Sequence, residues 1–292
     1  MKFVNIRSFS EKGCLSATML KFIALLFMTA DHLGAYSFEI PIIGRYADIL
    51  RSIGRIAAPM FLYFVVESYK KTSDKKRLLV RLYVAATIVG ICNYFMSSII
   101  VNVEFGNILH TFTWTVGILY LFEILKAAYT AKNYKSLAFG LSLAAAITII
   151  LYSIDICFSR LESADLMGVS KEAIKQAHIV FLSVLSTPRS LEYSFGFVFL
   201  GIVWYFQNTK LAQVISFIAL CTVSRILPFS FHSSFFNLSY LRVMSLPVIT
   251  IFVVLIALYN GKYGKGMKYF FYIYYPVHCY IIVISTKLMG FI

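Results

Sequence analysis

Residues 21–36 read KFIALLFMTADHLGAY, which is part of an apolar run over 20–38 that is long enough to cross a membrane as a helix. The whole chain has a similar character: 60% of its 292 residues are hydrophobic and 14% are charged. A soluble domain has roughly 45–50% apolar and about 25% charged residues. The composition therefore excludes a soluble enzyme, a disordered chain and a disulfide-rich secreted module, and it indicates an integral membrane protein.

Further apolar runs of spanning length follow the first one. We expect membrane-spanning helices near residues 20–38, 52–69, 79–101, 108–125, 136–158, 178–206, 211–228, 241–259 and 269–290. The longest polar connection is 159–177. Strands of a membrane barrel would be about 10 residues long with alternating polarity, which these runs are not. The prediction is an all-α, polytopic integral membrane protein with about nine transmembrane helices (eight to ten), forming a single transmembrane domain over 1–292 after a cytoplasmic N-terminal segment, 1–19.

The basic residues predict the orientation of the chain. The formal net charge is +14, and most Lys and Arg lie before residue 22 or in the loops 70–81, 126–135, 207–210 and 260–268. Cytoplasmic loops are rich in these residues, so we expect a plasma (inner) membrane protein with its N-terminus cytoplasmic and its C-terminus outside. This requires an even number of spans between 126–135 and 260–268. Segment 178–206 is then one long pass interrupted at Pro188-Arg189, or it includes a re-entrant piece.

The same distribution limits the expected partners. Because the loops account for the charge, the lipid bilayer is the expected partner and nucleic acid is not. The five cysteines are far apart and have no zinc-site spacing, so they are interpreted as small buried residues and no metal is expected. No Walker A, GxGxxG, GxSxG or HExxH pattern is present, so the corresponding nucleotide, hydrolase and zinc chemistries have no support.

Ionisable residues within apolar spans are costly and indicate functional sites. Asp31 and His32 lie about five residues before the first span ends, and Arg55 lies a similar distance into the second. Arg51 is four residues from Arg55 and shares its helical face. A buried Asp–Arg pair is the structural alternative, but it does not account for the histidine. A histidine oriented by a partner is the usual general base, and here that partner is expected to come from another span.

The last span carries a second intramembrane histidine. It reads KYFFYIYYPVHCYIIVIS over 268–285, and His278 lies ten residues after Lys268, which is about 15 Å along a helix. Pro276 frees a backbone carbonyl and kinks the helix. The alternative for His278 is ordinary hydrogen-bonded packing. His110 is a similar but weaker candidate. The remaining ionisable candidates have weaker grounds, because they lie near span ends or resemble interface residues: Glu67, Asp155, His178, Arg225 and His232.

Five segments in order carry a resemblance to a known family. They are LKFIALLFMTADHLGAY (20–36), RSIGRIAAPMFLYFVVESYKKT (51–72), NILHTFTWTVGILYL (107–121), SLEYSFGFVFLGIVWYF (190–206) and LYNGKYGKGMKYFFYIYYPVHCYII (258–282). Together they resemble the TraX family, whose namesake is the F-pilin acetylase of conjugation systems. The resemblance implies a membrane-embedded acyltransferase that uses acetyl-CoA as donor. The chain departs from the family pattern at His110 and at Glu192-Tyr193-Ser194, which leaves the acceptor open between a pilin N-terminus, a glycan and another envelope molecule.

With this resemblance the polar residues acquire expected roles. His32 is assigned the role of base, and His278 that of a reserve base or proton-relay partner. Arg55 or a tyrosine is expected to stabilise the developing oxyanion, and Asp31 to hold Arg55 or a histidine ring in place. Substrate-binding positions are Arg51, Glu67, Asn107 and Tyr275. Binding of the acetyl-CoA phosphates is assigned to Lys70, Lys71, Lys75, Lys76 and Arg77. The alternative functions are a proton-coupled transporter or flippase of a polar small molecule, and a membrane assembly factor without chemistry.

Overall fold

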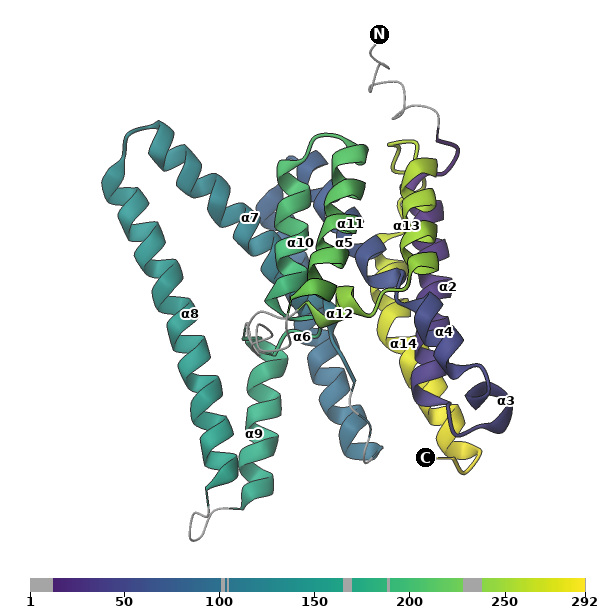
Figure 1. Cartoon of the computed structure of the whole chain (residues 1–292). Coiled ribbons are helices and arrows are strands. Elements are labelled where there is room, and N and C mark those ends of the chain that lie inside the picture. Colours follow the sequence, from purple (N-terminus) through teal and green to yellow (C-terminus); the bar gives the residue numbers. More distant parts are fainter. Residues whose placement is uncertain are drawn as a thin grey trace. The chain divides into compact units, whose positions relative to one another are not determined.

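The computed structural model describes residues 13–100, 103, 105–164, 170–187, 190–227 and 238–291. Within these ranges every regular element is a helix, which confirms the all-α prediction (Figure 1). In this described part of the chain, six helices are long and apolar enough to cross a membrane. They are α2 (Ala17–Tyr36), the combined helix Ala47–Lys71, α6 (Lys75–Ile99), α7 (Ile108–Thr130), α8 (Tyr134–Ser163), and Tyr269–Leu288 of α14 (Lys268–Leu288).

The other expected spans are formed by shorter helices. They are α9 (Lys171–Val184), α10 (Ser194–Phe206), α11 (Lys210–Ile226) and α13 (Leu246–Leu258), and the still shorter helices are α3 (Pro41–Gly44) and α12 (Ser239–Arg242). The predicted segment 178–206 is therefore two helices, and Pro188-Arg189 lies outside the described residues. The expected polar connection 159–177 was wrong over most of its length. α8 continues to Ser163, and α9 begins at Lys171. The average polarity of a stretch missed these helical residues, because it does not detect the polar end of a helix or a helix with one polar face.

Polar side chains begin several of these helices. The side chains of Ser16, Asp74, Asn133 and Thr209 each accept a hydrogen bond from the backbone N–H three residues later. Such caps satisfy one of the backbone donors that the first turn of a helix leaves without a partner. The second span is divided near Arg55, where α4 (Ala47–Gly54) ends and α5 (Ala57–Lys71) begins.

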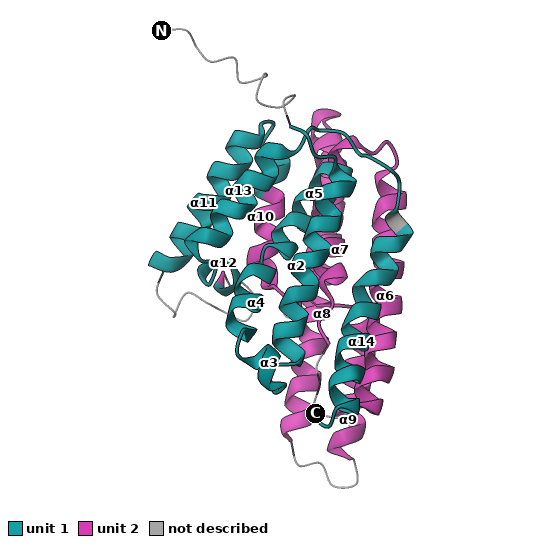
Figure 2. Cartoon of the chain, turned by 90° about the vertical axis from the view of Figure 1, so that its right-hand side faces the viewer, with its two compact units in different colours: residues 1–68, 203–227, 239–292 teal, residues 69–202, 228–238 magenta. Residues whose placement is uncertain are grey.

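The chain forms two compact units, which are coloured separately in Figure 2. Unit 1 contains residues 1–68, 203–227 and 239–292, and unit 2 contains 69–202 and 228–238. Unit 1 therefore brings together the two ends of the chain, whereas unit 2 is built around α6, α7, α8 and α9.

In unit 1, α2 and α14 lie side by side and run in the same direction. Phe22 contacts Phe270 near the start of the two helices, and Ser37 donates to or accepts from Thr286 at 2.7 Å near their ends. In the first turn of α2, Thr18 Oγ1 donates a hydrogen bond to the carbonyl of Tyr263, which precedes α14. The first helix and the last helix thus begin at one end of the unit, as the prediction of two basic segments on one side of the membrane requires.

Two glycines allow α4 to pack closely against α2 in the opposite direction. A Cβ at Gly54 would overlap the backbone and Cβ of Asp31, and one at Gly34 would lie 2.7 Å from the carbonyl oxygen of Ala47. Small residues at such crossings let two helix backbones approach each other. The polar residues Asp31 and Arg51 are consequently held on facing helices.

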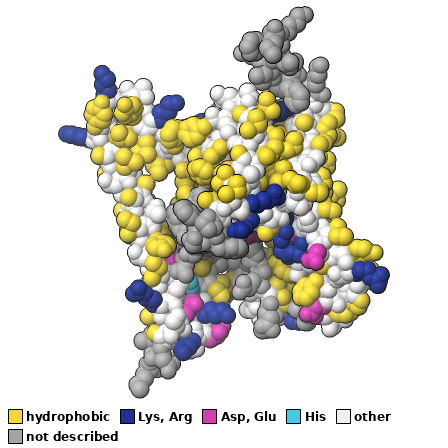
Figure 3. All heavy atoms as spheres, viewed as in Figure 1, with side chains coloured by type: hydrophobic (Ala, Val, Ile, Leu, Met, Phe, Trp, Pro, Cys, Tyr) yellow, Lys and Arg dark blue, Asp and Glu magenta, His cyan; other side chains and the backbone are white. Residues whose placement is uncertain are grey.

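Unit 2 has an apolar surface that water would not solvate favourably. The most apolar 18 residues of α8 have a mean hydropathy of 2.2, and none of them is buried within the structure. Ile149, for example, is 64% exposed. Figure 3 shows hydrophobic side chains along this helix and Lys and Arg near its turn with α7. This distribution suits a helix surrounded by lipid, with charged residues near the end of the span.

Candidate functional site

The polar centre of unit 1 is a hydrogen bond between two histidines from opposite ends of the chain. His32 Nδ1 on α2 lies 2.6 Å from His278 Nε2 on α14. The ring centres are 4.8 Å apart with 25° between the ring planes. The two rings therefore lie nearly end to end, with these two nitrogens facing each other. His278 is 6% exposed, and His32 is partly buried. The partner that orients His32 therefore comes from another span.

The next contact of His278 decides where its proton lies. His278 Nδ1 is 2.8 Å from the carbonyl oxygen of Tyr274, which can only accept a hydrogen bond. In the neutral ring this places the proton on Nδ1 and a lone pair on Nε2, facing His32. Neutral His32 then donates through Nδ1 and keeps the lone pair of its other nitrogen, Nε2, available as a base.

Tyr274 also holds the His278 ring in place. Its own ring stacks on His278 with centres 5.0 Å apart and 13° between the planes, and its hydroxyl bonds to Thr29 Oγ1 at 2.8 Å. Thr29 is one helical turn before His32 on α2, so Tyr274 ties the two helices together next to the histidines. Tyr275, a predicted substrate-binding residue, packs against the apolar cluster of Leu25, Met28 and Ala57.

A cysteine completes this centre. Cys279 Sγ lies 3.1 Å from His32 Nδ1 and 3.5 Å from His278 Nε2, and the residue is 8% exposed. We refer to His32, His278 and Cys279 as the His–His–Cys cluster. Among the described residues, these three have ligand atoms close enough together to hold a metal ion. The facing ring nitrogens, however, are closer than two zinc ligands, which lie roughly 3.3 Å apart when tetrahedral Zn–N bonds are about 2.0–2.1 Å.

Asp31 and the two arginines lie beside the cluster. The charges of Arg51 and Arg55 act on the carboxylate of Asp31, in agreement with the expectation that these residues share one depth. Oδ1 of Asp31 is buried without a hydrogen-bond partner among the described residues. Pairing with an arginine therefore does not satisfy this oxygen of the carboxylate. Arg55 follows the last residue of α4, and its carbonyl accepts a hydrogen bond from Tyr240 at 2.5 Å.

This arrangement can be compared with known proteins. The family model for the TraX protein matches residues 16–285 of the chain. The chain belongs to the TraX family. No curated protein and no solved structure matches it. The matched range includes the His–His–Cys cluster, Asp31 and both arginines, so these residues all lie in the part of the chain that is typical of TraX.

The remaining predicted site residues of this TraX member are not all in unit 1. Glu67 is partly buried near the end of α5 in unit 1. Asn107 is in unit 2, where it precedes α7 and its Nδ2 donates to the carbonyl of Ala86 at 2.8 Å. The Oδ1 of Asn107 is buried without a hydrogen-bond partner among the described residues. Asn107 therefore anchors α7 to α6 and retains one unused acceptor.

The predicted phosphate-binding residues fall into two groups. Lys75 is bound to Glu123 of α7, with 2.7 Å to Oε2, and its ammonium lies 4.8 Å from the ring centre of Tyr69. Lys75 therefore connects α6 to α7. Lys76 and Arg77 are exposed in the first turn of α6, and Arg77 forms a surface ion pair with Asp74 at 3.3 Å. Lys70 and Lys71 end α5.

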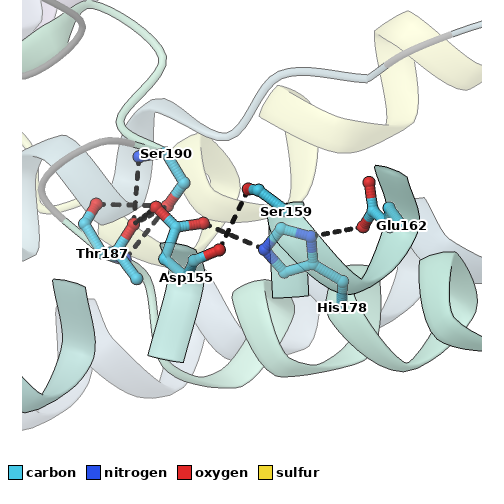
Figure 4. A network of polar contacts seen from close by, with 6 residues as sticks. All are labelled: Asp155, Ser159, Glu162, His178, Thr187 and Ser190. Carbon is cyan, nitrogen blue, oxygen red and sulfur yellow. Dashed lines mark hydrogen bonds and ion pairs between the residues drawn. The ribbon is translucent and has the colours of Figure 1, made fainter. Parts of the chain in front are cut away.

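A second polar network lies in unit 2 (Figure 4). His178 on α9 bonds through Nδ1 to Glu162 at 2.6 Å and through Nε2 to Asp155 at 2.9 Å. Asp155 also accepts a hydrogen bond from Thr187 at 3.2 Å. Both residues are buried within the protein, Asp155 with 4% and His178 with 9% of its surface exposed. The seven-residue spacing of Asp155 and Glu162, two turns on one face of α8, was the available signal.

Sequence reasoning also missed two other features. Cys279 was interpreted only as a small buried residue, although it directly follows His278. Arg225 was noted only as an ionisable residue near the end of a span. Its guanidinium instead donates hydrogen bonds to the carbonyls of Arg242 and Met244, and so holds the segment between α12 and α13. His232 and Arg189 lie outside the described residues.

Proposed function

We propose that this TraX-family chain is a membrane-embedded acyltransferase that moves an acetyl group from acetyl-CoA to an amine or hydroxyl of an envelope acceptor. The observation that carries the proposal is the hydrogen bond from His32 to His278, with the His278 proton fixed by the Tyr274 carbonyl. A base held by an oriented partner is the arrangement that acyl transfer requires. Family membership supports the same activity, because the family is associated with F-pilin acetylation.

In this proposal His32 Nε2 takes the proton of the acceptor amine or hydroxyl as that group becomes nucleophilic. His278 accepts from the Nδ1–H of His32 and stabilises the positive charge that His32 gains. Arg55 and Arg51 supply positive charge near the cluster, where the thioester carbonyl would develop negative charge. Asp31 offsets the charge of the arginines before substrate binds. The acceptor is a pilin N-terminus, a glycan hydroxyl or a similar envelope group.

The proposal is tested with the purified full-length protein, radiolabelled acetyl-CoA and envelope membranes as acceptor. Replacing His32 by Ala should lower acetyl transfer on the order of 100- to 10,000-fold, the usual contribution of a general base. The matched control is His110→Ala, which removes another buried histidine, in unit 2. Undiminished transfer by His32→Ala would exclude His32 as the base. Mass spectrometry of envelope material with and without the gene identifies the acetylated acceptor.

The second candidate function is proton-coupled transport. It is favoured by the chain of hydrogen bonds from Glu162 through His178 to Asp155, since carboxylate–histidine chains carry protons in membrane transporters. Ligand binding distinguishes the two functions. Acetyl-CoA or CoA should raise the thermal unfolding midpoint of a transferase, because a ligand that binds only the folded state stabilises it. Absence of a shift at millimolar acetyl-CoA together with proton-dependent uptake in vesicles would favour transport.

A further inference from the structure

The thiol of Cys279 occupies the position of a nucleophile relative to the histidine pair. It is 3.1 Å from His32 Nδ1, 3.5 Å from His278 Nε2 and 3.6 Å from the Tyr275 carbonyl. A nucleophile next to a base, with the base oriented by a third group, is the recurring arrangement of covalent catalysis. Cys279 Sγ and His278 Nε2 both face Nδ1 of His32, so the thiol, the base and the orienting residue are in mutual contact, and the Tyr274 carbonyl fixes the His278 ring.

We propose that Cys279 carries the acetyl group as a covalent thioester between acetyl-CoA and the acceptor. This inference rests on the proposed acyltransferase function and adds a residue and an intermediate to it. The alternative is direct transfer from acetyl-CoA to the acceptor, with Cys279 only filling space between α2 and α14.

The local charges favour the reactive form of this thiol. Transfer of the thiol proton to the free lone pair of His32, on Nε2, gives a thiolate next to a His32 imidazolium, whose Nδ1–H lies between Sγ and His278 Nε2. Reactive cysteines are found where nearby cations stabilise the thiolate. Cys221, the other buried cysteine among the described residues, is in α11 and has no such pair of histidines.

The two half-reactions balance without any further reactant. In the first, the Cys279 thiolate attacks the carbonyl carbon of acetyl-CoA, the new S–C bond forms and the bond from that carbon to the CoA sulfur breaks. CoA leaves as the thiol with the proton held by His32. In the second, the acceptor amine or hydroxyl attacks the Cys279 thioester while His32 takes its proton. The cysteine leaves as a thiolate, which regains this proton, and the enzyme returns to its starting state.

The experiment uses the purified full-length protein in nanodiscs with radiolabelled acetyl-CoA and no acceptor. We expect up to one acetyl group bound per chain, release of an equal amount of CoA, and loss of the label in neutral hydroxylamine, which cleaves thioesters. Peptide mass spectrometry should place the acetyl group on Cys279. Replacing Cys279 by Ala should abolish labelling and lower transfer to envelope membranes by at least about 100-fold, because it removes the nucleophile. Cys221→Ala, the matched control, should retain both.

The outcomes separate this inference from the proposed function. Wild-type protein that acetylates envelope membranes while Cys279→Ala does so at the same rate would overturn the covalent intermediate and leave the acyltransferase function intact. Wild-type protein that neither consumes acetyl-CoA nor acetylates envelope membranes would overturn both. If Cys279→Ala does not fold, Cys279→Ser replaces it. Serine should form at most an oxygen ester that resists neutral hydroxylamine, and a hydroxylamine-labile acetyl group in Cys279→Ser would contradict the proposal.

Discussion

His32 Nδ1 and His278 Nε2 are 2.6 Å apart although 246 positions separate the two residues in the sequence. The contact exists because α2 and α14 run side by side, and Tyr274 holds both helices next to it through its hydroxyl and its carbonyl. The centre therefore depends on the packing of the two ends of the chain. Changes that separate α2 from α14 should lower activity without touching either histidine.

The histidine pair should act as a unit. Replacing His278 by Ala leaves His32 without the acceptor that orients its ring, so acetyl transfer should fall on the order of 100-fold. Because His278 acts through His32, the double variant His32→Ala/His278→Ala should be no slower than His32→Ala alone. A double-mutant cycle on the turnover number measures this coupling. Losses that multiply independently would show that His278 acts on the substrate without His32.

The crossing of α2 and α4 should not tolerate a side chain at Gly54. A methyl group there would overlap the backbone of Asp31, so Gly54→Ala should destabilise the protein by about 1–3 kcal/mol, the usual cost of overpacking. Thermal unfolding in detergent measures the change. The matched control is Gly117→Ala in α7, where the nearest atom would be Leu79 Cδ1 at 3.8 Å. Alanine there should be neutral or stabilising, because it favours helix over glycine.

The sequence was sufficient for the helical fold and for part of the site. Apolar length identifies spans because lipid offers the backbone no hydrogen bonds, and the cost of burying charge drew attention to Asp31, His32 and His278. The sequence was not sufficient to predict a role for Cys279, because a single cysteine in an apolar helix is usually a small packing residue. Its contact with His32 becomes visible only when the neighbouring helix is known. Nor was the sequence sufficient for the two-carboxylate environment of His178, which depends on the pairing of α8 with α9. Both omissions concern contacts between helices, which apolar periodicity does not encode.

The basic residues 70–77 should divide into a structural group and a binding group. Lys76→Ala and Arg77→Ala remove exposed charges, so they should raise the KM for acetyl-CoA, with kcat unchanged and the effect weakened by salt. Lys75→Ala should chiefly lower the thermal stability, since it leaves Glu123 of α7 without its ammonium partner. Steady-state kinetics at two salt concentrations tests this division. The control is Lys135→Ala, an exposed basic residue at the start of α8, which should leave the KM unchanged.

The network around His178 should stabilise unit 2. Replacing His178 by Ala leaves the carboxylate of Asp155, whose side chain is 5% exposed, without its ring partner. A buried polar group that loses its partner costs about 1–3 kcal/mol, and more when it is charged, so the unfolding midpoint should fall clearly. Glu162→Gln should cost less, because that side chain is 33% exposed and the amide oxygen can still accept a hydrogen bond. Thermal unfolding of the wild type, His178→Ala and Glu162→Gln in the same detergent gives the order of their stabilities. A His178→Ala protein that is as stable as wild type but inactive would contradict this structural role and indicate that the network carries protons.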